Sequence, residues 1–228
     1  MFHPSYNCQR ITRDLDITGR VDDPLWQHAA IAELTEPTTG EPHALGTTAR
    51  MLYNDRYLYL GFHCQDDYIQ ATLTAHDAEV WTEGCCEAFL CPSDKMRQYY
   101  EINVNPLNTV FDTFILNGRE NMSSPWTCTS LIDYTCDGLI TRVHVDGEIG
   151  VVGGVTGWTA EYAIPFTALI GADHLVPEPG DRWRMNLCRI GSAPAQEDMR
   201  YYAWATIGAV NFHTPWQFGT LCFGGTIA

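Results

Sequence analysis

Short runs in which hydrophobic and polar residues alternate recur along the chain, and they predict β-strands. These runs are rich in Tyr, Phe, Val and Ile, and clusters of Gly, Pro, Asn and Asp separate them. The runs at 49–53 and 57–64, which Asn54-Asp55-Arg56 joins, predict a hairpin with a short polar turn. The remaining predicted strands cover residues 86–91, 98–104, 110–116, 139–145, 158–164, 183–190 and 220–223.

Helical signals are few. Residues 165–170 begin with a proline and end before Gly171, which predicts one short connecting helix, and a second turn is predicted at 24–27. With nine strands and almost no helix, the sequence predicts an all-β fold, an antiparallel β-sandwich of two packed sheets with an immunoglobulin- or jelly-roll-like arrangement. Residues 147–157 indicate a wide hairpin, and with no repeat or linker, residues 1–228 are predicted to form a single domain.

Composition and charge exclude several classes of protein. Hydrophobic residues make up 45% of the chain, which is enough for a core, and 28 acidic against 13 basic residues give a net charge of -15. Such a charge repels phosphate backbones and anionic lipid, so neither nucleic acid nor a membrane is expected as a partner. No run approaches the roughly 18 apolar residues that span a bilayer. Residues 1–11 lack the features of a secretion signal, which predicts a cytoplasmic protein, or a secreted one if a leader has been removed.

Nine cysteines are scattered through the sequence, most of them inside apolar strand-like runs. An odd number without a secretion signal favours reduced thiols. No Cys-x-x-Cys pair indicates a zinc site. The cysteines are therefore expected to serve as small core residues.

Paired carboxylates are the first candidates for chemistry, because glycoside hydrolases hold an acid and a base or nucleophile across a cleft. If 86–91 and 98–104 are neighbouring strands, Glu87 and Glu101 can share one face. Facing acids also act as ligand acceptors or cation ligands, so a glycan hydrolase and a binding site both stay open. The chain has no Gly-x-Ser-x-Gly elbow and no phosphate-binding loop. The carboxylates considered are Glu83, Glu87, Glu101, Asp112 and Glu161.

Aromatic residues in polar loops point to sugar recognition. The apolar C–H faces of a sugar stack on flat rings, while its hydroxyl groups need amide and carboxylate partners. Trp81 lies in a polar loop that enters a strand, and Phe212 lies in the loop 208–215, where neither ring is readily explained as core. The alternative for each is a small hydrophobic cluster beneath a loop.

Taken in order, these segments and others resemble the family-9 carbohydrate-binding modules and their relatives in the wider DOMON-like superfamily. The resemblance covers nearly the whole chain. Its motifs are Ile17-Thr18-Gly19-Arg20-Val21-Asp22-Asp23-Pro24-Leu25-Trp26, the hairpin at 52–59, Trp81 followed by Glu87-Ala88-Phe89-Leu90, Tyr99-Tyr100-Glu101-Ile102-Asn103-Val104-Asn105-Pro106, the segment 157–166 and Pro215-Trp216-Gln217-Phe218-Gly219-Thr220-Leu221.

The resemblance implies non-catalytic binding of a mono- or oligosaccharide, in which two rings sandwich a terminal sugar and polar side chains hold its hydroxyl groups. Trp81 matches one ring, and Glu87, six residues later, matches the acidic contact. Phe212 stands where a second tryptophan is expected, and Asn103 where well-studied relatives carry arginine. Weaker candidates for polar contacts are Asn105, Asn211 and Gln217.

The resemblance also bears on metals and cofactors. It implies structural calcium but assigns no ligands to it, and no cofactor for catalysis. Acidic turns at Asp66-Asp67, Asp133, Asp137 and Asp146 lack the spacing of a dedicated calcium loop. Another branch of the superfamily binds haem through axial side chains that include Met. The six Met residues here form no motif, and a haem-binding electron-transfer domain is the second alternative.

Overall fold

The computed structural model describes residues 3–93 and 96–227, and within these ranges the regular structure consists of thirteen β-strands and five short 3₁₀ segments, with no α-helix. The 3₁₀ segments are η1 (Pro24–His28), η2 (Val80–Thr82), η3 (Phe166–Ala168), η4 (Gln196–Asp198) and η5 (Pro215–Gln217). The strands are β1 (Ser5–Arg10), β2 (Ala32–Leu34), β3 (Thr47–Tyr53), β4 (Tyr57–Gln65), β5 (Cys85–Cys91), β6 (Gln98–Val104), β7 (Val110–Asn117), β8 (Cys128–Leu131), β9 (Ile140–Gly147), β10 (Val155–Pro165), β11 (Arg182–Gly191), β12 (Arg200–Ala203) and β13 (Gly219–Thr226).

The predicted all-β fold with very little helix is confirmed, and each of the nine predicted strands is present. The β3–β4 hairpin pairs Leu52 with Tyr59, and the predicted wide hairpin at 147–157 joins β9 to β10. The two predicted helical turns are η3 and η1. Strands β1, β2, β8 and β12 are not predicted. Three of them have only three or four residues, which is too short for an alternating pattern to be recognised.

The strands hydrogen-bond along one continuous path, in the order β8-β7-β6-β5-β11-β13-β1-β3-β4-β10-β9, with β12 beside β11 and β2 beside β3. The expectation of purely antiparallel pairing is wrong at β1, which is parallel to both β13 and β3. Ser5 pairs with Thr220 and Gln9 pairs with Leu52. Parallel partners are joined through long connections, so no local turn signal reveals them in the sequence.

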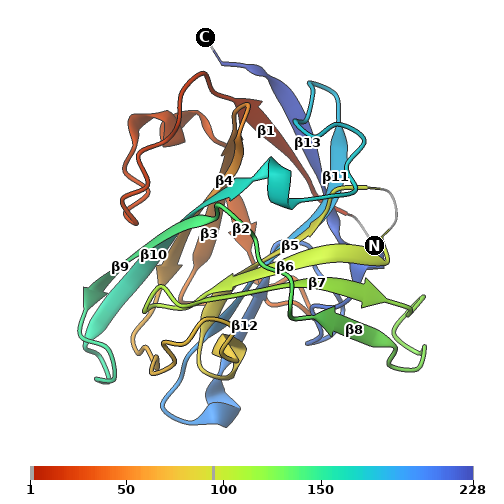
Figure 1. The fold of residues 1–228 in the computed structure, drawn as a ribbon. Coiled ribbons are helices and arrows are strands. Elements are labelled where there is room, and N and C mark those ends of the chain that lie inside the picture. Colours follow the sequence, from red (N-terminus) through yellow and green to blue (C-terminus); the bar gives the residue numbers. More distant parts are fainter. Residues whose placement is uncertain (1–2, 94–95, 228) are drawn as a thin grey trace.

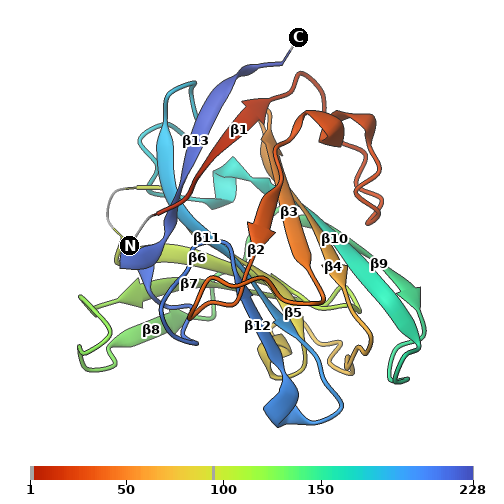
Figure 2. The same ribbon diagram turned by 180° about the vertical axis from the view of Figure 1, so that it is seen from behind.

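The two ends of this path lie on opposite sides of the molecule. Strands β7 and β8 occupy one side, β9 and β10 the other, and β1 and β13 run along the top between them (Figures 1 and 2). Between the two groups, the hydroxyl group of Tyr162 on β10 donates a hydrogen bond to the carbonyl oxygen of Cys86 on β5 at 2.8 Å. The Sγ atoms of Cys64 on β4 and Cys86 lie 3.4 Å apart. Strands β4 and β10 therefore pack against β5 in the core, although they are far from it in the strand order.

The main core lies between these two groups of strands. Burying each large apolar side chain contributes roughly 1.5–3 kcal/mol relative to leaving it exposed. All nine cysteines are free and seven are buried, as expected of reduced thiols that act as core residues. Fully buried members of this core include Leu60, Phe62, Leu90, Ile102, Tyr162 and Leu187.

Strand β5 is buried on both faces, and this arrangement positions the candidate site. Ala88 and Leu90 point into the main core, whereas Cys85, Phe89 and Cys91 join a second cluster on the opposite face of β5, β6 and β11. Residues from loops cover this second cluster, including Val80 and Phe212. All residues of β5 are buried because one face of the strand packs against the main core and the other lies beneath the loops that cover the second cluster.

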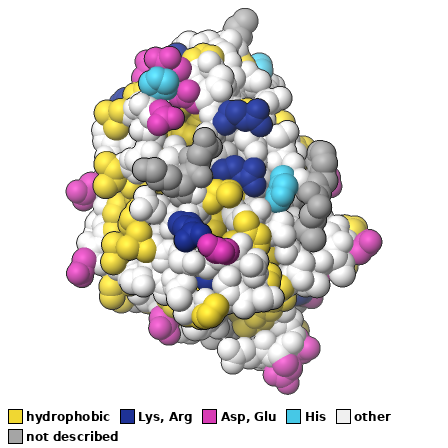
Figure 3. All heavy atoms as spheres, turned by 90° about the vertical axis from the view of Figure 1, so that its right-hand side faces the viewer, with side chains coloured by type: hydrophobic (Ala, Val, Ile, Leu, Met, Phe, Trp, Pro, Cys, Tyr) yellow, Lys and Arg dark blue, Asp and Glu magenta, His cyan; other side chains and the backbone are white. Residues whose placement is uncertain are grey.

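On the side of the molecule that lies at the right in Figure 1, patches of hydrophobic side chains run between a few basic ones (Figure 3). Acidic side chains in this view gather mainly toward the outline. None of the helices in the described part of the chain has the length and hydropathy to span a bilayer.

Candidate functional site

A cleft of about 400 Å³ lies over the second hydrophobic cluster. Its floor comes from one face of β5, β6, β7 and β11, and its walls come from η2, β8, β12 and the loops that follow β7 and β12. The side chains that line it are mainly aromatic and carry only a few polar groups, as is typical of small-ligand sites. They belong to Trp81, Glu87, Phe89, Glu101, Phe111, Trp126, Ser130, Ile190, Tyr201, Val210, Asn211, Phe212 and His213.

Two carboxyl groups lie side by side on this floor. Glu87 pairs with Asn103 across the β5–β6 ladder, and Phe89 pairs with Glu101. Residues two apart on a strand share a face, and so do residues directly opposite each other, so Glu87 and Glu101 are diagonal neighbours. The expectation that the two acids share one face is confirmed.

The two predicted sugar-stacking rings line the same cleft. Trp81, in η2, is half-buried, and its ring contacts that of Phe111 edge-on at a centroid distance of 4.7 Å. Phe212 keeps 9% of its surface exposed and contacts Phe89 edge-on at 6.3 Å. Both rings belong to the second cluster rather than the main core, so the rings remain part of the cleft wall. Trp81 in η2 and residues 210–213 in the loop after β12 reach the cleft from widely separated positions in the chain.

The carboxyl group of Glu87 is buried and has few hydrogen-bond partners. Its Oε1 atom accepts only a weak hydrogen bond from the Cys85 thiol at 3.3 Å, and its Oε2 atom has no partner within the described structure. Burial, and then the nearby Glu101, raise the pKa of Glu87 well above its usual range. Burial therefore favours the protonated form of Glu87, which can both donate and accept hydrogen bonds.

Glu101 is similarly buried, at 6% exposure, but has a better partner. Its Oε1 atom accepts a hydrogen bond from Nδ2 of Asn103 at 2.8 Å. Burial raises the pKa of Glu101 to about 7, and the Asn103 amide opposes this shift. The pair of acids therefore changes its charge close to neutral pH.

The nearby imidazole is uncharged. The Nδ1 atom of His213 is hydrogen-bonded to the Tyr99 hydroxyl group at 3.0 Å. The Nε2 atom of His213 lies 3.9 Å from Oε2 of Glu101. Burial, and then the charge of Arg119, lower the pKa of His213 to about 4. At neutral pH this histidine contributes no positive charge to the carboxyl pair.

Of the predicted site residues, Trp81, Glu87, Asn211 and Phe212 line the cleft. Asn103 lies on the same sheet face, fully buried beneath the lining, and its Oδ1 atom has no partner in the described structure.

Two predicted residues lie outside the lining. Asn105 holds the β6–β7 turn, because its Oδ1 atom accepts hydrogen bonds from the backbone N–H groups of Leu107 and Thr109. Its amide donates to the carbonyl oxygen of Leu73. Gln217 belongs to η5.

Sequence reasoning missed several cleft residues. Trp126 is 59% exposed in the loop between β7 and β8, and its ring lies edge-on to His213 at 5.8 Å. An indole in a polar loop is the signal that identified Trp81, and it would also have found Trp126. Phe89, Phe111 and Tyr201 gave no such signal, because each lies in or beside an ordinary apolar strand pattern.

The other candidate carboxylates serve the structure. Glu161 is fully buried, and its oxygens accept hydrogen bonds from the backbone N–H groups of Thr18 and Gly19 and from Nε1 of Trp26. Glu83 accepts hydrogen bonds from the backbone N–H groups of Thr72 and Leu73. These carboxylates are occupied within the fold and are not arranged for catalysis.

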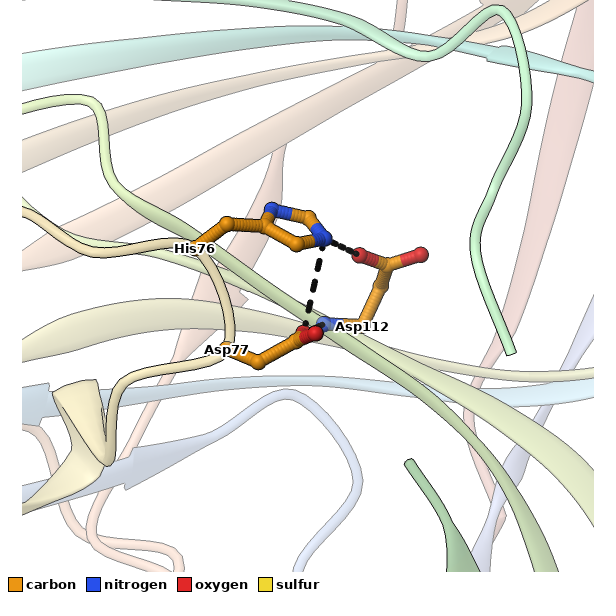
Figure 4. A group of neighbouring side chains, drawn as sticks. All are labelled: His76, Asp77 and Asp112. Carbon is orange, nitrogen blue, oxygen red and sulfur yellow. Dashed lines mark hydrogen bonds and ion pairs between the residues drawn. The ribbon is translucent and has the colours of Figure 1, made fainter. Parts of the chain in front are cut away.

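Asp112 belongs to the one group of three metal-ligating side chains found among the described residues. Nε2 of His76 lies 3.1 Å from Oδ1 of Asp112 and 3.5 Å from Oδ1 of Asp77 (Figure 4). An imidazole suits transition metals better than calcium, which prefers oxygen ligands, and three ligands are too few for a structural zinc site. The group does not fit the structural calcium implied by the resemblance, which stays a prediction.

Among the acidic turns considered for calcium, Asp66 is occupied by two guanidinium groups. It forms ion pairs with Arg189 and, at 2.8 Å, with Arg200, while Nε1 of Trp158 donates to it at 3.2 Å. A carboxylate with these partners is a structural anchor rather than a free cation ligand.

A β-rich domain with an aromatic cleft over two buried carboxyl groups defines a ligand-binding module. Residues 39–223 match the sequence model of carbohydrate-binding family 9. The chain therefore belongs to this family, which confirms the resemblance found in the sequence and the prediction of a carbohydrate-binding domain. No curated protein sequence matches the chain.

Solved structures show the same fold at low sequence identity. A protein from Bacteroides uniformis for which carbohydrate binding is proposed aligns with a TM-score of 0.73 at 18% identity, over 97% of this chain and all of that one. A family-9 module from Caldicellulosiruptor kristjanssonii in complex with cellotriose aligns at 0.64 and 12% identity, over 97% of this chain and 95% of the other. The complex with glucose gives 0.65 and 12%, with coverages of 98% and 97%.

Proposed function

We propose that residues 1–228 form a single carbohydrate-binding β-sandwich and that its cleft holds the terminal unit of a mono- or oligosaccharide between Trp81 and Phe212. The sugar's apolar face stacks on these rings, and its hydroxyl groups meet the polar atoms of the floor. Solved family-9 modules in complex with glucose and with cellotriose support a ligand of this kind.

The observation that carries this proposal is the pair of polar atoms without partners beneath the rings. Oε2 of Glu87 and Oδ1 of Asn103 are buried and accept no hydrogen bond in the described structure. Leaving such an atom unpaired costs about 1–3 kcal/mol, and a ligand that donates to it recovers this energy. Sugar hydroxyl groups are donors of the required kind, and the aromatic walls match the sugar's C–H faces.

We expect binding without bond cleavage. The family consists of carbohydrate-binding modules, and the two acids that would have to act as acid and base are buried at the floor beneath aromatic rings. Incubation with a panel of aryl glycosides should release no aryl alcohol. Turnover that disappears in Glu87→Gln would replace binding with hydrolysis as the function.

The direct test is a glycan array followed by titration calorimetry of the best ligand with wild type, Trp81→Ala and Trp81→Phe. Losing one stacked ring should remove on the order of 1 kcal/mol or more, which is about a fivefold loss of affinity, and Trp81→Phe should recover part of it. Val152→Ala, an exposed position in the β9–β10 connection, is the matched control. Unchanged affinity in Trp81→Ala would remove this ring from the site.

A further inference from the structure

The charges of the cleft are unbalanced. Two carboxyl groups line it, and none of the described lining residues is Lys or Arg. His213 is the single basic side chain in the lining, and it is neutral above about pH 4. A buried carboxylate without a cationic partner is costly, so such groups either keep their protons or receive a cation from outside.

The arginine whose charge acts on His213 is Arg119, which is buried outside the cleft lining and has two nitrogens, Nε and Nη1, without a hydrogen-bond partner in the described structure. The guanidinium group of Arg119 lies over the rings of Trp126 and Trp216, at 5.1 and 5.6 Å from their centroids. Its Nη2 atom donates to the carbonyl oxygen of Met122 at 3.0 Å. Arg119 is not part of the cleft lining and forms no ion pair with Glu87 or Glu101 in the described structure.

The walls of the cleft favour a positive charge as well. Aromatic faces attract ammonium groups, and the attraction grows when water is excluded. An ammonium group in this cleft would lie close to aromatic side chains as well as to the two acids. The net charge of -15 adds a long-range attraction for cations. The rings in question are those of Trp81, Phe89, Phe111, Trp126, Tyr201 and Phe212.

We propose that the preferred ligand is an amino sugar whose protonated amine is held by Glu101, with Glu87 beside it and the aromatic rings around it. This inference rests on the proposed sugar-binding function and names the chemical class of the sugar. A neutral hydroxyl group at the same place can donate one hydrogen bond, whereas an ammonium group brings three N–H donors and the missing charge.

The test compares three disaccharides that differ chiefly at C2 of each ring: cellobiose with a hydroxyl group, the chitosan disaccharide with an ammonium group, and chitobiose with an acetamido group. Titration calorimetry is run at about pH 7, with 6-amino-6-deoxyglucose against glucose as a second pair. Hydrogen bonds to charged groups contribute about 1.5–3 kcal/mol, so an amine should improve affinity about ten- to a hundredfold.

Proton release gives an independent readout that needs no variant. At about pH 6 the amine is protonated, and in most molecules Glu101 is protonated as well. Binding of the ammonium group should therefore release close to one proton per ligand. Calorimetry in two buffers of different ionisation enthalpy measures this proton, and a neutral sugar should release none. Binding of the amine without proton release would overturn the role of Glu101.

The variant arm uses Glu101→Gln, with Glu148→Gln, an exposed carboxylate in the β9–β10 connection, as the matched control. Glu101→Gln should abolish the preference for the amine, measured as the ratio of the affinities for the amino sugar and the neutral sugar, whereas the control should keep the wild-type ratio. If cellobiose binds as tightly as its amino counterpart, the inference fails and the sugar-binding function stands. If no glycan binds, both fail.

Discussion

Two buried carboxylates, Glu161 and Glu87, lie on strands of the same sheet path and differ in what surrounds them. Glu161 accepts three hydrogen bonds, from Thr18, Gly19 and Trp26. Glu87 receives one weak contact from a thiol, and one of its oxygens receives none. Both are almost fully buried, so burial alone does not separate them.

The difference indicates which polar groups belong to the fold and which await a ligand. A buried carboxylate with all its oxygens paired fixes the path of the chain around it, as Glu161 does for residues 18–26. A carboxyl group left unpaired beside an open cleft is satisfied only when something enters that cleft. If this distinction holds, substitutions at the first kind of site change stability, and substitutions at the second kind change binding and its pH dependence.

The largest effect is expected for Glu161→Ala. The substitution leaves two buried donors and one partly buried donor without an acceptor, and the free energy of unfolding should fall by about 3–5 kcal/mol. Denaturant unfolding measures this loss. Glu148→Ala, at an exposed position, should stay within about 0.5 kcal/mol of wild type. A loss below about 1 kcal/mol for Glu161→Ala would abolish the distinction between the two carboxylates.

The second effect is the pH dependence that Glu101 imposes on the stability of the fold. The pKa of Glu101 is raised from 4.5 to about 7, so the folded protein keeps a proton that the unfolded chain releases. The contribution of Glu101 to stability is therefore greatest at low pH, falls as pH rises between these values, and is constant above them, with a total change of about 2–4 kcal/mol. Burial lowers the pKa of His213 from 6.5 to about 4, so between these values the unfolded chain binds a proton that the folded protein does not, and this contribution to stability rises with pH and opposes that of Glu101.

Glu101→Gln removes this dependence, so relative to wild type it should be more stable at pH 8 than at pH 5. Unfolding curves at several pH values, recorded beside Glu148→Gln, measure the difference between the slopes. Parallel curves for wild type and Glu101→Gln would show that Glu101 is ionised in the folded protein across the whole range.

A smaller effect is expected for Glu87→Gln. Because burial favours the protonated form of Glu87, an amide of the same shape should leave the free energy of unfolding within about 1 kcal/mol of wild type. Affinity for the sugar should fall about three- to tenfold, since the amide changes the arrangement of donors and acceptors on the floor. Calorimetry and thermal melting on the same preparation measure affinity and stability separately. A large loss of stability would show that Glu87, like Glu161, serves the fold rather than the binding site.

The smallest effect is expected at the rim. Trp126 is 59% exposed, so Trp126→Ala should leave the melting temperature nearly unchanged and reduce sugar affinity about two- to fivefold. Titration of the ligand found on the glycan array measures the change. A loss as large as that of Trp81→Ala would make Trp126 one of the two principal stacking rings.

The sequence predicted where strands occur better than it predicted which strands pair with each other. Alternation of residue types reports which face of a strand is buried, so the β3–β4 hairpin and the shared face of Glu87 and Glu101 were both predictable. The position of β1 was not, because parallel pairing between Ser5 and Thr220 depends on the path of the whole chain.

For the candidate site, sequence reasoning located residues whose type conflicts with their setting, such as Trp81 in a polar loop. It could not distinguish Asn105, which holds a turn, from Asn211, which lines the cleft, because both amides follow strands or loops of similar composition. Nor could it find His213, whose neutral state depends on burial and on Arg119, far away in the sequence.

The pairing of β1 with both β13 and β3 also affects how the protein folds. Because β1 pairs with both β13 and β3, the link that it makes between the two halves of the strand order waits until residues 219–226 have left the ribosome. Contacts that span almost the whole chain carry a large loop-closure entropy and slow the rate-limiting step to milliseconds or longer. Refolding experiments should therefore find local hairpins such as β3–β4 forming first, with cooperative closure as the slow final phase.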